Sequence, residues 1–127
     1  MNLRVSKPLA TLIFLALLAT LLGVFKFNSC EGNGWATPAQ YIHACYSDIP
    51  ALYGARDLDK DQWSYSSTTD AVEYPVLTGT VMWIFALATP TGENEILNYY
   101  RINITFLAAL FIFIAVIVYR IRPRFAY

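Results

Sequence analysis

The chain has 127 residues, of which 57% are hydrophobic and 14% are charged, and its mean hydropathy is +0.43. This composition excludes an ordinary soluble domain and is typical of a membrane protein. Nine basic and nine acidic residues give a net charge of zero. Because the basic residues form no cluster with the spacing of a phosphate backbone, we expect no nucleic-acid partner.

The charged residues are unevenly distributed along the chain. All nine acidic residues lie between positions 31 and 95. Basic residues gather towards both ends, at Arg4, Lys7, Lys26, Arg120, Arg122 and Arg124. An acidic middle is therefore flanked by two basic ends.

Two apolar stretches are long enough to cross a bilayer, since a transmembrane helix needs about 20 apolar residues. The first covers residues 9–27 and the second covers residues 102–119. Residues 1–7 also fit the basic region of a signal peptide. However, the apolar run exceeds the usual length of about 7 to 15 and lacks a small-residue cleavage site, so we expect the first helix to stay.

A third apolar run, residues 76–88, lies between Pro75 and Pro90. At about 1.5 Å per residue it would cover roughly 20 Å, which is less than the hydrocarbon core of about 30 Å. A third span would also put the two basic ends on opposite sides of the membrane, whereas two spans keep both in the cytoplasm. We therefore predict a short interfacial helix over residues 75–89.

The predicted fold is thus an all-α, multi-pass plasma-membrane protein with both termini in the cytoplasm. Two transmembrane helices are linked by a large extracytoplasmic loop with short juxtamembrane helices. The predicted segments are residues 1–27 (N-terminus and first span), 28–101 (loop, with interfacial helices near 38–54 and 75–89), 102–119 (second span) and 120–127 (basic tail).

Cys30 and Cys45 both fall in the predicted outer loop, where an oxidising compartment permits disulfides. A bridge between them would contribute about 3 kcal/mol by loop entropy. Two free cysteines are the alternative. A zinc site is disfavoured, because two cysteines and the single His43 fall short of four ligands.

The loop is expected to continue with a helix from Pro38, with Thr37 as its cap. Because the residue before a proline is disfavoured in the α region, Pro50 should limit this helix and leave Asp48 near its C-terminal end. A carboxylate there opposes the helix dipole, which favours a functional role for Asp48.

A calcium loop is a weaker interpretation of the acidic segment that follows. Asp57, Asp59 and Asp61 alternate, but Lys60 interrupts them and no glycine or closing glutamate follows at the required spacing. We predict no metal site.

Two motifs in the loop carry a family resemblance. Residues 41–53 read YIHACYSDIPALY and residues 72–79 read VEYPVLTG. In this order they resemble the start of integral-membrane glycosyltransferases of the GT-C fold, and most of all family 87, the polyprenyl-phosphate-mannose-dependent mannosyltransferases of actinobacteria. That resemblance implies a first transmembrane helix followed by a large outer loop with an acidic catalytic motif.

The resemblance also implies roles for individual residues. Asp48 matches the catalytic aspartate, which would act as a general base while a sugar, mannose in that family, moves from a polyprenyl-phosphate donor to a cell-envelope glycan or glycolipid. Glu73, Tyr74 and Pro75 match the second motif, where Glu73 and Tyr74 would contact substrate. An acidic start to a short helix is the alternative for Glu73. No cofactor is implied, and a divalent-metal requirement is left open.

The chain departs from this family in length. Members continue through further helices that enclose the lipid-phosphate donor, which two helices cannot do. We therefore expect a truncated or split enzyme that is inactive alone and works with a downstream multi-helix membrane protein. The alternative is a small non-catalytic membrane subunit of a larger complex.

Overall fold

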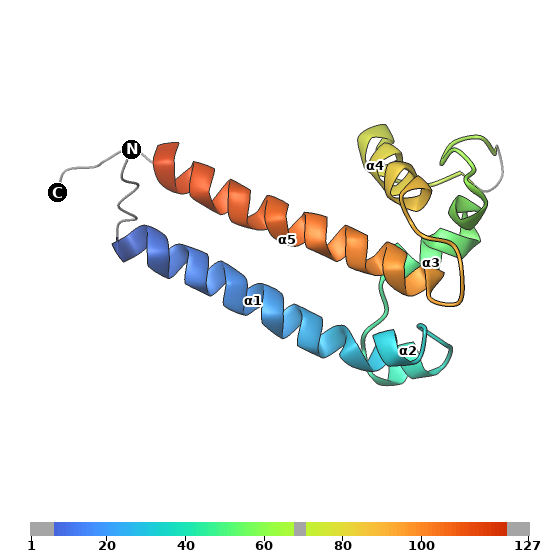
Figure 1. Cartoon of the computed structure of the whole chain (residues 1–127), viewed down its shortest axis with the longest axis horizontal. Helices are drawn as coiled ribbons and strands as arrows, with labels where there is room; N and C mark the ends of the chain where they lie inside the picture. Colours follow the sequence, from blue (N-terminus) through green and yellow to red (C-terminus); the bar gives the residue numbers. More distant parts are fainter. Residues whose placement is uncertain (1–6, 68–70, 122–127) are drawn as a thin grey trace. The chain divides into compact units, whose positions relative to one another are not determined.

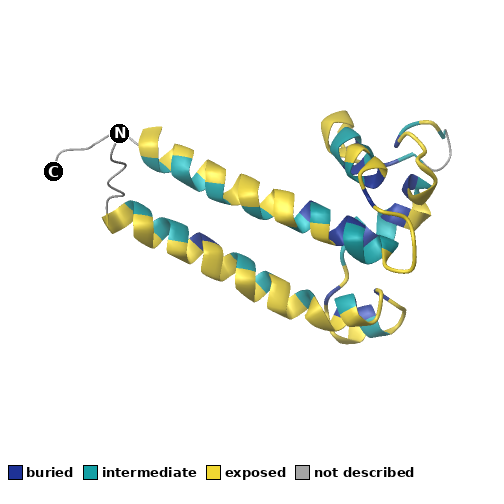
Figure 2. Cartoon of the chain, viewed as in Figure 1, coloured by how far each residue is buried: buried dark blue, intermediate teal, exposed yellow. Residues whose placement is uncertain are grey.

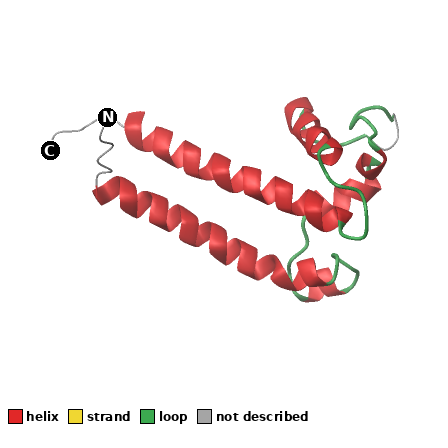
Figure 3. Cartoon of the chain, in the orientation of Figure 1, coloured by secondary structure: helices red, strands yellow, loops and turns green. Residues whose placement is uncertain are grey.

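The computed structural model describes residues 7–67 and 71–121, and within these ranges all regular secondary structure is helical (Figures 1 and 3). Arg4, Arg122 and Arg124, which belong to the basic ends of the chain, lie outside the described residues. The chain divides into two compact units. Unit 1 combines the parts of the chain before Phe27 and after Ile104, and unit 2 is Phe27–Ile104.

Two long helices match the predicted spans. Helix α1 covers Lys7–Gly32 and α5 covers Glu95–Ile121, and both are long and apolar enough to cross a membrane. Only 6% of the most apolar 18-residue stretch of each helix is buried within the protein, and Figure 2 shows exposed residues along α1 and along the second half of α5. In water, so much exposed apolar surface would be strongly unfavourable.

Both helices extend beyond the predicted spans into unit 2. At the end of α1, the backbone N–H of Trp35 returns to the carbonyl of Cys30 at 3.0 Å, and Gly34 adopts the left-handed conformation that this turn requires. The first turns of α5 bring Arg101 back to Glu31, with an N···O distance of 2.6 Å.

Between these helices, unit 2 contains α2 (Ala39–Ile42), α3 (Asp48–Ala55), a short 3-10 turn (Leu58–Lys60) and α4 (Val76–Leu87). The expectation of one helix from Pro38 that ends near Pro50 is therefore wrong. The chain breaks after Ile42, passes through Ala44 at a positive φ of 50° and starts a new helix at Asp48.

Helix α4 occupies most of the predicted interval 75–89. Pro75 precedes it, where the missing N–H of proline costs no intrahelical bond. One side of α4 buries Gly79, Met82 and Ala86 in unit 2, while Leu77 is 77% exposed. The position of α4 at a membrane interface stays a prediction.

Two buried clusters hold unit 2 together. The larger contains Tyr53, Leu58, Val72, Met82, Ala86 and Tyr99. The smaller is built around a disulfide between Cys30 and Cys45, whose Cα atoms are 6.1 Å apart, and includes Trp35 and Tyr100. Trp35 packs on Tyr100 with ring centroids 4.4 Å apart. The predicted bridge is therefore present, and it ties the segment after α1 to the last turns of that helix.

Candidate functional site

Asp48 and Tyr74, which come from the two separate motifs, meet in the structure. The Tyr74 hydroxyl donates a hydrogen bond to Oδ2 of Asp48 across 26 positions of sequence. Both residues are exposed to solvent. The contact joins the start of α3 to the segment that leads into α4.

The local setting of Asp48 differs from the prediction. Asp48 is the first residue of α3, and the Ser47 hydroxyl caps this helix by accepting a hydrogen bond from the N–H of Ile49 at 3.3 Å. Pro50 lies in the first turn, where a proline is tolerated because its missing N–H has no intrahelical partner anyway. A carboxylate at this end of a helix complements the dipole instead of opposing it. The prediction that Asp48 lies near the C-terminal end of a helix is therefore wrong, and the helix dipole gives no reason to assign it a function.

Two further tyrosines extend the cluster around Asp48. A hydrogen bond to Asp48 raises the pKa of the Tyr46 hydroxyl, and the same interaction raises the pKa of the Tyr74 hydroxyl. The ring of Tyr41 stacks on that of Tyr46, with centroids 5.7 Å apart. We call Tyr41, Tyr46, Asp48 and Tyr74 the tyrosine–aspartate cluster.

Tyr46 was not predicted, although the sequence carried a usable signal for it. Ser47 has extended dihedrals, with φ of −143° and ψ of 137°. In extended backbone, residues two apart point to the same side, so a cap at Ser47 brings Tyr46 and Asp48 together.

Glu73 lies apart from the hydrogen bonds around Asp48. Its Oε1 is 3.5 Å from the guanidinium of Arg56, and its side chain is 88% exposed. Helix α4 begins at Val76 after an N-cap at Pro75, so Glu73 is not in the first turn and the helix-start explanation does not apply. A role for Glu73 in substrate binding stays a prediction.

The segment that carries Tyr74 is held in place by hydrogen bonds from Ser64 and Tyr65, which precede it in the chain. The Tyr65 hydroxyl lies 2.9 Å from the carbonyl oxygen of Tyr74 and 3.0 Å from that of Pro75, and it donates to this pair. The Ser64 hydroxyl donates to the carbonyl of Gly79 at 2.7 Å. A Cβ at Gly79 would stand 2.1 Å from the Tyr65 oxygen, so only glycine permits this approach.

Other candidate groups are not brought into the cluster. Among the described residues, no group of three or more His, Cys, Asp or Glu side chains could hold a metal ion. Asp57 instead pairs with Lys60 at 2.6 Å, and His43 is an exposed residue at the end of α2.

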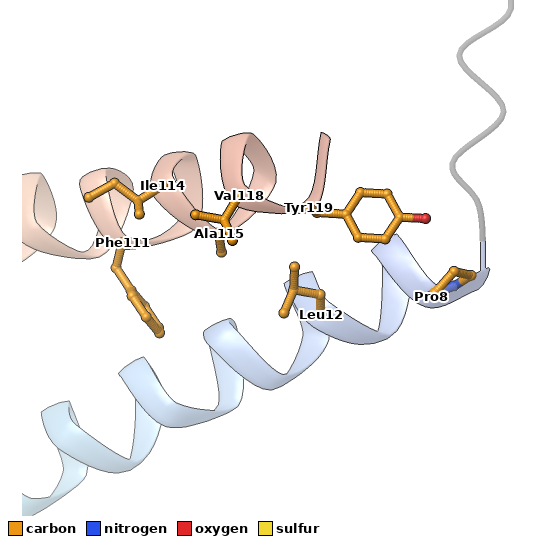
Figure 4. Close-up of a pocket in the computed structure, with 7 residues that line it drawn as sticks. All are labelled: Pro8, Leu12, Phe111, Ile114, Ala115, Val118 and Tyr119. Carbon is orange, nitrogen blue, oxygen red and sulfur yellow. The ribbon is translucent and has the colours of Figure 1, made fainter. Parts of the chain in front are cut away.

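Unit 1 contains an apolar groove of about 370 Å³ between α1 and α5 (Figure 4). Its lining comes from both helices: Pro8, Leu12, Phe111, Ile114, Ala115, Val118 and Tyr119. The groove offers hydrocarbon contacts and a single phenol, and none of the predicted site residues lines it. Such a lining matches the chemistry of an aliphatic chain or of another apolar helix.

The tyrosine–aspartate cluster can therefore do two things chemically. Its exposed carboxylate can accept a proton, and its phenols can orient that carboxylate by hydrogen bonds.

No family model, curated protein or solved structure matches this chain.

Proposed function

We propose that α1 and α5 span the plasma membrane, with both termini in the cytoplasm and residues 28–101 outside. The exposed apolar side chains of both helices support this proposal, because lipid is the solvent in which such a surface is stable. The basic residues near both ends support the orientation.

We further propose that unit 2 is the catalytic-loop module of a glycosyltransferase that uses a polyprenyl-phosphate sugar, mannose by family resemblance. The observation that carries this proposal is the hydrogen bond from Tyr74 to Asp48. It unites the two motifs on which the resemblance depends, and it joins residues that are far apart in the sequence.

In this reaction, Asp48 is the general base. The hydroxyl oxygen of an acceptor glycan or glycolipid bonds to the anomeric carbon of the sugar as the bond from that carbon to the phosphate oxygen breaks. The hydroxyl proton passes to Asp48, and polyprenyl phosphate leaves. Tyr74 is a positioning residue that holds the carboxylate. A single base suffices for such an inverting transfer, since no covalent sugar intermediate forms.

A partner is part of this proposal. Asp48 is exposed, and general-base catalysis needs a bound acceptor held within about 3 Å of the carboxylate. We propose that a multi-helix membrane protein, encoded downstream, completes the donor site around it.

The test is sugar transfer in native membranes in which the chromosomal gene carries a substitution. Asp48→Asn keeps the size of the side chain but removes the proton acceptor, so transfer from polyprenyl-phosphate mannose should fall by about 10² to 10⁴-fold. Tyr74→Phe removes only the positioning hydrogen bond, which is worth about 1 kcal/mol, so the loss should be roughly fivefold.

The matched control is Asp57→Asn. Asp57 is a carboxylate in an exposed ion pair, and it has a left-handed φ of 54° that asparagine also tolerates. Membranes that carry the Asp57→Asn variant should transfer sugar at the rate of the parent protein. Parental activity in Asp48→Asn membranes that contain normal amounts of the protein would refute the catalytic role.

A small non-catalytic membrane subunit is the second candidate. The observation that favours it is the position of Asp48 in the first turn of α3, which gives this carboxylate a structural reason to be there. The protein encoded by the adjacent downstream reading frame distinguishes the two candidate functions. A multi-helix protein without its own first loop favours the split transferase, and a complete set of unrelated genes favours the subunit.

A further inference from the structure

The loop closed by the Cys30–Cys45 disulfide buries a polar side chain and exposes apolar ones. In its short helix α2, the polar Gln40 is buried and donates to the Thr37 hydroxyl at 3.1 Å. The apolar side chains face outwards instead: Tyr41 is 60% exposed and Ile42 is 72% exposed. Helices that pack on an aqueous surface show the opposite arrangement.

Apart from Glu31, the same loop carries no charged side chain. Residues 32–47 contain no Asp, Glu, Lys or Arg, although every acidic residue of the chain lies between positions 31 and 95. Desolvation of this loop therefore costs far less than desolvation of the charged segments that surround it. The absence of charge disfavours an electrostatic protein partner and suits a lipid surface.

The disulfide holds this loop near the end of the proposed first span. Cys30 follows Phe27, where the apolar run ends, by three residues of the continuous helix α1. At about 1.5 Å per residue, Cys30 lies about 5 Å beyond that run. The headgroup region on each side of a bilayer is roughly 5 to 8 Å thick, so Cys30 would fall at this depth. The disulfide keeps the Cα of Cys45 6.1 Å from that of Cys30.

We infer that the exposed edge formed by Tyr41 and Ile42 is a membrane anchor that inserts into the lipid interface. Tyrosine suits this depth, because its ring is apolar and its hydroxyl stays hydrated. The inference rests on the proposed insertion of α1 in the membrane, and it does not depend on glycosyl transfer.

The anchor has a consequence for the tyrosine–aspartate cluster. Tyr41 stacks on Tyr46, and Tyr46 is hydrogen-bonded to Asp48. Lipid insertion of Tyr41 would therefore keep the Asp48 carboxylate close to the bilayer surface.

The test uses the full chain with its disulfide intact, reconstituted in liposomes of phosphatidylcholine and phosphatidylglycerol. A nitroxide is attached at His43→Cys, which leaves both anchor residues in place. Matched labels are attached at Leu15→Cys in α1 and at Ser66→Cys in the exposed polar loop. Collision of each nitroxide with oxygen, which concentrates in lipid, is compared with collision with a water-soluble nickel chelate.

The label at position 43 should give an oxygen-to-nickel ratio between those at positions 15 and 66. Tyr41→Ser combined with Ile42→Ser should lower the ratio at position 43 several-fold, to the value at position 66. In the Cys30→Ser/Cys45→Ser variant the ratio should fall in the same way, because the tether to α1 is lost.

Failure of the anchor and failure of membrane insertion give different results. A nickel-accessible label at position 43, with position 15 protected, overturns the anchor and leaves the spanning helix intact. A nickel-accessible label at position 15 overturns membrane insertion itself. A ratio at position 43 that does not change when Tyr41 and Ile42 become serine also overturns the anchor.

Discussion

Gly79→Ala should destabilise unit 2, although alanine is the better helix former. In an unhindered helix this change stabilises by about 1 kcal/mol. Here the added Cβ would stand 2.1 Å from the Tyr65 oxygen and 2.6 Å from the adjacent ring carbon, which no real contact allows. Overpacking of this kind costs about 1 to 3 kcal/mol. The displaced Tyr65 would also lose its hydrogen bond at Tyr74 and Pro75, worth about another 1 kcal/mol.

The net expectation is a loss of about 1 to 3 kcal/mol in the free energy of unfolding. It can be measured by urea titration in detergent micelles, followed by tryptophan fluorescence, because Trp63 packs against Tyr65 with ring centroids 5.5 Å apart. The Tyr65→Ala background supplies the decisive comparison. There the steric conflict is gone, and Gly79→Ala should stabilise by up to about 1 kcal/mol.

The sign of the Gly79→Ala effect on stability should therefore depend on the Tyr65 ring. If Gly79→Ala has the same effect with and without the Tyr65 ring, the close approach is not what selects glycine. Tyr65→Phe cannot replace Tyr65→Ala in the cycle, because the ring carbons themselves lie within 2.8 Å of the added Cβ.

Three further predictions concern the alkaline limit of stability, the disulfide and the topology. Tyr53 donates to Glu95 at 2.6 Å, and burial followed by this hydrogen bond raises the pKa of Tyr53. The folded chain therefore holds the phenol proton more tightly than the unfolded chain, so stability should fall as pH rises above about 10. A Tyr53→Phe variant with an equally steep decline would contradict this. Thiol labelling after denaturation without reductant should modify neither Cys30 nor Cys45, and two modified thiols would disprove the bridge. A reporter fused after Gly92 should be extracytoplasmic; a cytoplasmic signal there would mean that α4 crosses the membrane.

The long helices were predictable because their signal is strong and local. Apolar runs of sufficient length define α1 and α5, and the flanking prolines define α4. The extensions of α1 and α5 beyond the apolar runs were not predicted, since they depend on packing within unit 2. The packing of Trp35 on Tyr100 and the pairing of Arg101 with Glu31 are contacts between segments far apart in the sequence.

The break between α2 and α3 was missed for a local reason. Pro50 alone indicates the end of a helix, whereas Ser47, Asp48 and Pro50 together are equally typical of a helix start. The reversal at Ala44 has no sequence signal, because alanine seldom adopts a positive φ. The meeting of Asp48 with Tyr74 was not predicted from the local pattern of either motif, since the contact spans 26 positions.

The ion pair between Glu31 and Arg101 brings together the two ends of the long segment between these residues. These residues are 70 positions apart in sequence, yet the guanidinium of Arg101 lies 2.6 Å from the carboxylate of Glu31. Segments whose ends lie close together can be moved into a new host without straining it. Residues 31–101 therefore form a cassette that could be exchanged between proteins built on a pair of long apolar helices, because its internal contacts would move with it.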